Sequence, residues 1–172
     1  KIIVCVKQVP DTAATMSVED GNINWGDASL IINPWDEYAV EAALDLKAEH
    51  GGEVIALGMG KEKETEAIKH ALAMGADEAV QVSDPQLQGA DAVGVARVLA
   101  AAIQKIDGAN MVLMGQEAVD SQSGMLTSQV GRLLGWPIYP LVSSFTALDP
   151  EAGSLQVERA IEEGKQVVSG SM

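Results

Sequence analysis

The chain has 172 residues, of which 47% are hydrophobic and 3% aromatic, so it suits one domain with a core of Ala, Val, Leu, Ile and Met. Its formal net charge of −14 at pH 7 argues against nucleic acid as a partner, because no basic stripe is present. No apolar run reaches the length of a membrane span, and the start lacks a signal-peptide pattern. A single Cys excludes an internal disulfide. We therefore expect a soluble, cytoplasmic protein without membrane insertion.

Four apolar runs alternate with four amphipathic stretches in the larger, N-terminal part of the chain. The runs have the length and β-branched character of strands buried on both faces, at residues 1–6, 53–57, 79–82 and 110–114. The amphipathic stretches have helical spacing, at residues 34–50, 64–74, 90–106 and 125–134. This βαβαβαβα order predicts an α/β fold, a Rossmann-like three-layer α/β/α arrangement with a mostly parallel sheet and right-handed crossovers.

Two parts of the chain have a different pattern. Residues 11–24 show no clean period, whereas residues 23–32 contain enough Ile, Trp and Leu for a short extra strand or hairpin. Beyond Trp136, turn formers separate extended runs at residues 141–145, 155–160 and 165–168. We expect a single domain over residues 1–172 that ends in an antiparallel strand pair at about residues 138–168. An exposed pair of this kind either joins another subunit or marks a truncation.

The first amphipathic stretch opens with a helix-start signal. Asn33 is of N-cap type, and Pro34 suits the first helical position, where its missing N–H is not needed. The expected buried face consists of Trp35, Ala39, Ala42, Ala43 and Leu46. Asp36 is expected on another face, where its charge complements the helix dipole.

The stretch 112–134 has the pattern of a strand, a polar loop and a helix. The loop contains Asp120, Ser121, Gln122, Ser123 and Gly124, and an apolar helical face follows it. Such a loop leaves backbone N–H groups unpaired at the positive end of the helix dipole, which attracts a phosphate without a basic side chain. A plain N-cap turn would have the same composition, and the residues of the loop alone leave both interpretations open.

Three candidate segments lie at the carboxyl ends of predicted strands. They are the loop after Cys5, the turn of Gly58, Met59 and Gly60, and the loop that begins at Gly115. In parallel sheets, ligands bind beyond these ends, where the strand order reverses. An adenine nucleotide could therefore lie with its base near the first two segments and its phosphate on the helix after Gly124.

Several enzyme signatures are absent from the sequence. It contains no G-x-x-x-x-G-K-[ST] and no G-x-G-x-x-G after the first strand, and no G-x-S-x-G nucleophile elbow. His50 and His70 lack the spacing of a metal site, and Cys5 lies inside a predicted buried strand. We therefore expect no catalytic residue and no bound metal.

Five sequence blocks carry a resemblance to a known family. They read VKQVPDT at 6–12, INPWDEYAVEAAL at 32–44, ALAMGADEAVQV at 71–82, GQEAVD at 115–120 and GWP at 135–137. In this order they resemble the beta subunit of electron transfer flavoprotein, over nearly the whole chain. The resemblance implies an adenine nucleotide alpha hydrolase-like fold and an electron carrier without catalytic residues. It also implies an alpha-subunit partner that holds most of a shared FAD, and electron flow from dehydrogenases, bound through the heterodimer, to a quinone-linked acceptor.

The resemblance also implies a nucleotide pocket that holds AMP, or a second FAD in electron-bifurcating members. Cys5, Val6 and Met59 would lie at the adenine, largely through backbone atoms, and Asn33, Pro34, Trp35 and Asp36 would close the nucleoside side. The residues at the ribose and phosphate would be Gly115, Asp120, Ser121, Gln122, Ser123, Gly124, Met125, Leu126 and Thr127. The family commonly reads D-G-D-T-G-Q-V-G where this chain reads D-S-Q-S-G-M-L-T, so backbone contacts carry over but the side-chain contacts of Gln122 and Met125 do not. The family's C-terminal docking segment and arm are not in this sequence.

Two other classes share parts of this pattern. A stress-type regulatory module that binds adenine nucleotides would have the same alternating fold and phosphate loop, but no flavoprotein partner. An adenylyl-transfer enzyme would need a pyrophosphate loop such as S-G-G-x-D-S or an H-I-G-H-like signature, and the sequence has neither.

Overall fold

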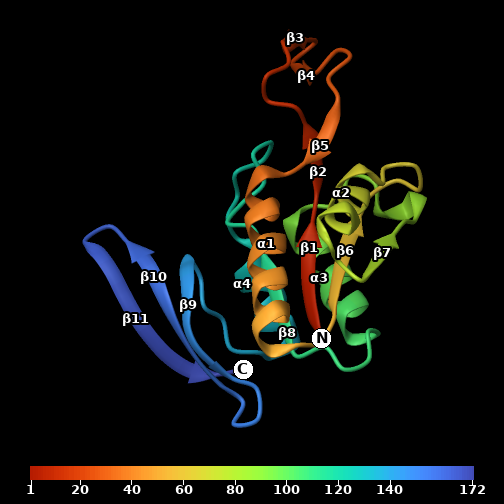
Figure 1. Ribbon diagram of the computed structural model, residues 1–172. Helices are drawn as coiled ribbons and strands as arrows, with labels where there is room; N and C mark the ends of the chain where they lie inside the picture. Colours follow the sequence, from red (N-terminus) through yellow and green to blue (C-terminus); the bar gives the residue numbers. More distant parts are fainter.

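A four-stranded parallel sheet forms the centre of the molecule (Figure 1). The structure, a computed structural model, describes residues 1–21 and 23–172. The strands of this sheet are β1 (Ile2–Val6), β6 (Val54–Met59), β7 (Glu78–Val82) and β8 (Met111–Met114). They lie in the order β7-β6-β1-β8, with Cys5 in register with Leu57 on one side and Met114 on the other. All four predicted strands are present.

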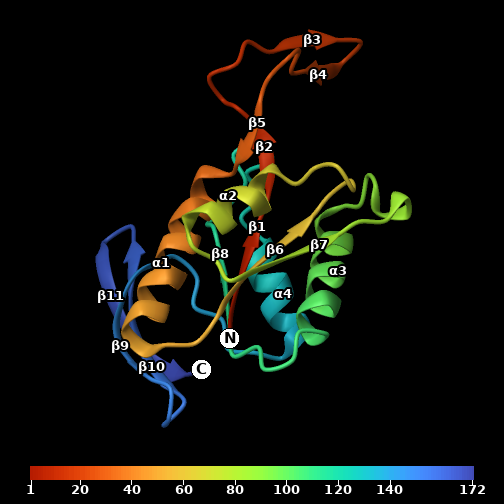
Figure 2. The ribbon, with the colours of Figure 1, turned by 45° about the vertical axis from the view of Figure 1, so that its right-hand side comes forward.

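Helices cover both faces of this sheet (Figure 2). They are α1 (Pro34–His50), α2 (Glu66–Met74), α3 (Ala92–Gln104) and α4 (Leu126–Leu134). Alternate residues of β1 point to opposite faces: Val4 and Val6 pack in a core with α1 and α2, whereas Ile3 and Cys5 pack with α3 and α4. The predicted three-layer α/β/α arrangement is confirmed. A short 3-10 helix, η1 (Pro85–Leu87), was not expected from the sequence.

Strand β6 is longer than its apolar run. The sequence places its end at Leu57, yet the strand continues through Gly58 to Met59. A Cβ built on Gly58 would lie 2.6 Å from Gln81 Oε1 and 2.9 Å from a methyl carbon of Ile68. The strand therefore continues because glycine leaves room for these side chains, and this glycine does not mark a turn.

An antiparallel arm projects beyond the carboxyl ends of the sheet (Figure 1). Strand β2 (Gln8–Pro10) pairs with β5 (Leu30–Ile32), and β3 (Ser17–Glu19) pairs with β4 (Asn22–Asn24) at the tip. The extra strand expected within residues 23–32 is present. The sequence interpretation missed β3, although Asp20 and Gly21, which both have positive φ, form the Asp-Gly type of hairpin turn.

The chain finishes in a second sheet that stands beside α1 (Figure 1). Its strands β9 (Val142–Asp149), β10 (Ser154–Ile161) and β11 (Gly164–Ser171) are antiparallel, in the order β11-β10-β9. The sequence predicted a strand pair, and the structure has three strands because the extended run that begins at Leu141 also pairs. Within the described part of the chain, no helix is both long and apolar enough to cross a membrane.

Candidate functional site

The strand order reverses at β1. From β1 the chain passes to β6 and β7 on one side of the sheet, and then returns to β8 on the other side. The loops that follow β1 and β8 therefore leave the sheet side by side, beyond its carboxyl edge. This is the position at which open α/β sheets bind ligands.

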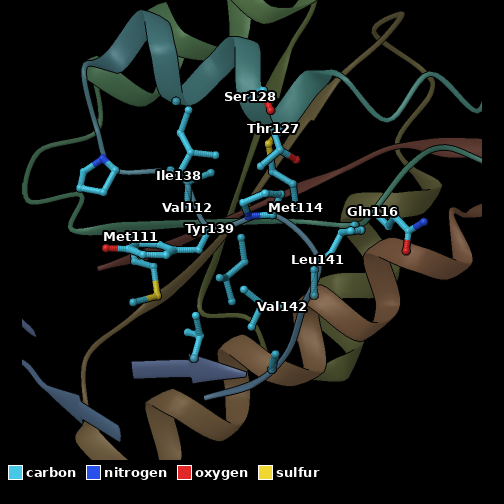
Figure 3. A pocket seen from close by; sticks show the side chains of 18 of the residues that line it. Met111, Val112, Met114, Gln116, Thr127, Ser128, Ile138, Tyr139, Leu141 and Val142 are labelled. Carbon is cyan, nitrogen blue, oxygen red and sulfur yellow. The ribbon is translucent and has the colours of Figure 1, made fainter. Parts of the chain in front are cut away.

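A cavity of about 820 Å³ borders this position. It lies between β8, α1, the length of α4 and residues 136–145, and most of its lining is apolar. Figure 3 shows Met111, Val112 and Met114 of β8 on one wall, with Thr127 and Ser128 of α4 nearby. Four of the predicted site residues line the cavity: Trp35, Gly115, Gly124 and Thr127.

At the start of α4, several backbone N–H groups have no hydrogen-bond acceptor among the described residues. Among the described residues, the first amide that bonds back into this end of the helix is Gln129 N–H, which donates to the Met125 carbonyl at 3.1 Å. The N–H groups of residues 123–128 have no acceptor within the described part of the chain. No side chain caps the helix either. The predicted cradle of free amides is therefore open.

The loop that leads to this helix start packs tightly against α1. A Cβ on Gly115 would lie 2.7 Å from the Trp35 carbonyl carbon and 2.9 Å from the Asp36 nitrogen. Glycine is required here because the backbones of β8 and α1 approach too closely for any side chain. Gly115 thus sets the position of the loop relative to α1.

Asn33 and Asp36 differ from what the helix pattern predicted for them. Asn33 occupies the N-cap position, but its side chain does not cap α1. Its Nδ2 donates to the Glu117 carbonyl at 2.9 Å, and its Oδ1 accepts from Val119 N–H at 3.1 Å.

Asp36, expected to be solvated, is 7% exposed, because with Ala39, Val40 and Ala43 it forms the buried stripe of α1. Trp35, expected in that stripe, is 38% exposed.

The Asp36 carboxylate binds the ends of two strands. Its Oδ2 accepts from Lys7 N–H, which follows β1, at 2.8 Å. It also accepts from Gly115 N–H after β8 and from the Asn33 side chain. Burial raises the pKa of Asp36 to about 6, although these hydrogen bonds and the Lys7 charge oppose the rise.

Lys7 joins the phosphate loop through an ion pair. Its Nζ lies 2.6 Å from Asp120 Oδ1 and 2.7 Å from Asp120 Oδ2. Sequence reasoning missed this role of Lys7, as well as the backbone contacts of Glu117 and Val119. The lysine was visible as the cation of the VKQVPDT block, but nothing local indicates that Asp120, more than a hundred residues away, is its partner.

Two of the three predicted adenine residues, Cys5 and Met59, lie on the α3 and α4 side of the sheet. Cys5 is buried in a core to which Met59 and Leu126 also contribute, so three predicted site residues from β1, β6 and α4 pack together. Burial, and secondarily the Asp36 charge, raises the pKa of the Cys5 thiol to about 12, which makes it unsuited to act as a nucleophile. Val6 points to the opposite face, in the core with α1 and α2.

The middle of the loop is separate from these contacts. Ser121, Gln122, Ser123 and Met125 are exposed, and within the described part of the chain no side-chain hydrogen bond joins them to the other predicted residues. Gln122 has a φ of 49°, which is a left-handed conformation, and its N–H donates to the Ala118 carbonyl at 2.8 Å. No cluster of three or more His, Cys, Asp or Glu that could hold a metal occurs among the described residues.

The fold and this site define a class: doubly wound α/β domains with an open, amide-lined loop at the switch point. A family model described as "Electron transfer flavoprotein domain" matches residues 26–170. The chain therefore belongs to the electron transfer flavoprotein family, and the predicted resemblance to its beta subunits is confirmed.

The chain is similar to several curated proteins of this family. It is 37% identical over 170 residues to the caffeyl-CoA reductase-Etf complex subunit CarD of Acetobacterium woodii, covering 98% of this chain and 64% of that protein. It is 37% identical over 173 residues to electron transfer flavoprotein subunit beta of Syntrophomonas wolfei, covering 100% and 66%. It is 36% identical over 172 residues to protein FixA of Azorhizobium caulinodans, covering 97% and 61%. The chain thus spans a little under two thirds of the length of these relatives.

Proposed function

We propose that this chain is the nucleotide-binding part of an electron transfer flavoprotein beta subunit. The observation that carries the proposal is the row of unpaired amides at residues 123–128, at the switch point of a family member. Four to six convergent N–H groups at a helix start bind a dianionic phosphate without a cation. The bound group would be AMP, or the adenylate half of a second FAD.

The rest of the nucleotide would lie over the carboxyl ends of β1 and β6. Phosphate would bind the amides of residues 123–126, and adenine would approach Cys5, Val6 and Met59. Asp120 would accept a ribose hydroxyl, since its carboxylate lies at the loop and, among the described residues, has Lys7 as its ion-pair partner. Trp35 and Thr127 line the cavity on the other side of the loop.

In this proposal the chain carries no catalytic residue and works with an alpha subunit. The FAD that the pair shares supplies the redox chemistry, and electrons pass from dehydrogenases to a quinone-linked acceptor. The name of the Acetobacterium woodii relative, a subunit of a reductase-Etf complex, supports assembly with partner chains. Co-purification with a flavin-bearing chain would distinguish this function from a regulatory nucleotide-binding module, and the absorption spectrum of the extracted ligand would distinguish AMP from FAD.

Adding AMP to the ligand-free protein should raise its melting temperature. At about 100 times the dissociation constant, binding to the native state alone adds ~2.7 kcal/mol of stability. For a chain of this size that corresponds to roughly 5–11 °C, measured by differential scanning calorimetry. Adenosine at the same concentration should give a smaller shift because it lacks the phosphate. If AMP, ADP and FAD all leave the melting temperature unchanged, the proposed site is wrong.

Two loop variants should separate backbone from side-chain recognition. Gly124→Pro should abolish the AMP-induced shift, because proline removes an N–H and cannot adopt the φ of 60° found at this position. Gln122→Ala should keep most of the shift, because the Gln122 side chain is exposed and points to no other predicted residue. Circular dichroism of both ligand-free variants checks that the fold is retained. Equal losses of binding would mean that side chains hold the phosphate.

A further inference from the structure

Two polar side chains are buried in the described part of the chain, and they lie three residues apart. Asn33 is 1% exposed and Asp36 is 7% exposed. A buried amide or carboxylate destabilises the fold unless hydrogen bonds compensate its lost hydration. Neither residue serves the helix it begins, since α1 has no side-chain cap. Both side chains instead bind the segments that leave β1 and β8.

The Asn33 amide is fully committed to protein atoms. A primary amide has two N–H donors and one acceptor oxygen. One donor binds the Glu117 carbonyl, the other is available to the Asp36 carboxylate, and the oxygen accepts from Val119 N–H. Asn33 therefore has no side-chain N–H left for a nucleotide, so its contribution to binding must act through the loop.

The Asp36 carboxylate holds three donors that come from three segments: Lys7 N–H, Gly115 N–H and the Asn33 side chain. An ionised carboxylate is a pure acceptor, whereas the protonated acid carries an O–H donor and loses acceptor capacity. Protonated Asp36 would therefore bind these groups less strongly, since hydrogen bonds to a charged acceptor are the stronger ones. The change falls between pH 5 and 7, because burial raises the pKa of Asp36 to about 6.

These contacts lead directly to the free amides. The Asp36 carboxylate binds the backbone at Gly115, and the Asn33 side chain binds the backbone of residues 117 and 119. Lys7 connects the two ends of this network, because its N–H donates to Asp36 and its Nζ donates to Asp120. The unpaired N–H groups begin three residues later. The charged and titratable groups that face Asp36 are Lys7 and Cys5 of the β1 segment, with Asp120 bound to Lys7 on the loop side.

We propose that Asn33 and Asp36 are positioning residues for the nucleotide phosphate, and that the loop presents its amides correctly only while Asp36 is ionised. This inference rests on the proposed function and adds a regulation to it: nucleotide affinity decreases when Asp36 takes up a proton. The Cys5 thiol, whose pKa is raised to about 12, stays neutral in this range.

Calorimetric titration with adenosine 5′-methylphosphate at pH 5, 6, 7 and 8 tests this proposal. The methyl ester keeps one negative charge throughout, whereas the phosphate of AMP has a pKa near 6 of its own. The dissociation constant of the wild-type protein should rise about tenfold from pH 8 to pH 5, the equivalent of one lost charge-assisted hydrogen bond. Asp36→Asn should bind at all four pH values about as weakly as the wild type does at pH 5.

Glu37→Gln is the matched control. Glu37 is the neighbouring carboxylate on α1, and its Oε1 lies 3.0 Å from His70 Nε2 on the surface. This variant removes a neighbouring carboxylate that lies outside the network bound to the loop, so it should keep the wild-type binding profile. Lys7→Gln should weaken binding several-fold and move the midpoint to higher pH, because it releases Asp120 and removes the charge that lowers the pKa of Asp36.

Melting temperatures of the ligand-free proteins separate positioning from a loss of fold. The pKa of Asp36 is higher in the folded chain than the 3.8 of a free side chain, so protonation favours the folded state. Nucleotide affinity should therefore decrease toward pH 5, whereas protonation of Asp36 should not lower the stability of the ligand-free protein. Two results would overturn this inference but not the proposed nucleotide site: a wild-type affinity that is constant with pH, or an Asp36→Asn protein that keeps the wild-type dependence of affinity on pH. No binding by either protein at any pH would overturn the proposed nucleotide site as well.

Discussion

Gly115→Ala should destabilise the protein by about 1–3 kcal/mol and abolish its response to AMP. The added Cβ would overlap Asp36 Oδ1, and it would lie 2.7 Å from the Trp35 carbonyl carbon and 2.9 Å from the Asp36 nitrogen. Two of these three atoms belong to the backbone of α1, so no side-chain rotation relieves the overlap. Either the helix start or the loop must move, and both border the proposed nucleotide site.

Calorimetry with and without AMP measures both effects. The melting temperature of the ligand-free variant should fall by roughly 2–12 °C. Gly94→Ala is the control, because a Cβ there meets no atom closer than the Ala90 Cβ at 3.3 Å and alanine favours the helix in which Gly94 lies. A Gly115→Ala protein with wild-type stability and an undiminished AMP response would mean that the loop and α1 are not in close contact.

Asn33→Ala should lower the unfolding free energy by about 2–4 kcal/mol. The substitution leaves the Glu117 carbonyl and Val119 N–H without their partner, and it removes one donor from the buried Asp36 carboxylate. The two backbone groups are only partly buried, so water replaces some of the lost bonds and keeps the effect at a few kcal/mol. Urea unfolding measures the loss.

Asn24→Ala provides the comparison. Asn24 also accepts one backbone N–H, from Gly26 at 2.8 Å, but it does so in the exposed arm. Its replacement should change the unfolding free energy by about 1 kcal/mol or less. If the two Asn variants are equally stable, the Asn33 amide does not hold the loop, and its hydrogen bonds in the structure carry no net stabilisation.

The sequence predicted those features that depend on neighbouring residues in the chain. Ile2–Val6 and Val54–Met59 are continuous apolar runs, and the stretch Ala92–Gln104 has a clear apolar face, so their types follow from local pattern. The order of these elements then fixes a parallel sheet, since βαβ crossovers are almost always right-handed. The polar loop before α4 was predicted for the same reason, because its glycine and polar residues directly precede a helix.

Features that depend on contacts distant in sequence were predicted poorly. Asn33 has every local attribute of an N-cap, but its side chain turns to residues 117 and 119, and only the folded structure shows this. Asp36 is buried because Gly115 and Lys7 offer it hydrogen bonds, although a carboxylate in the first turn of a helix is ordinarily solvated. Gly58 was taken as a turn because the side chain that fills its space, Gln81, lies on the next strand.

The β3–β4 hairpin was missed for a different reason. Its Asp-Gly turn is among the strongest local hairpin signals, but the flanking residues lack alternation because Val18 and Ile23 are both exposed. A hairpin without a buried face leaves little periodicity in its sequence. The turn residues of this hairpin therefore indicate its position in the sequence, whereas its strand residues do not.

The sheet formed by β9, β10 and β11 has one more consequence. Its ladders are complete within itself, and in the described part of the molecule it shares no strand pairing with β8. The links to the body are side-chain contacts, such as the Tyr139 hydroxyl donating to the Ser171 carbonyl at 2.8 Å and Ile138 packed on Gly131. We therefore expect the sheet of β9, β10 and β11 to open locally at a lower free energy than the central sheet, without disturbing the strands that position the loop before α4.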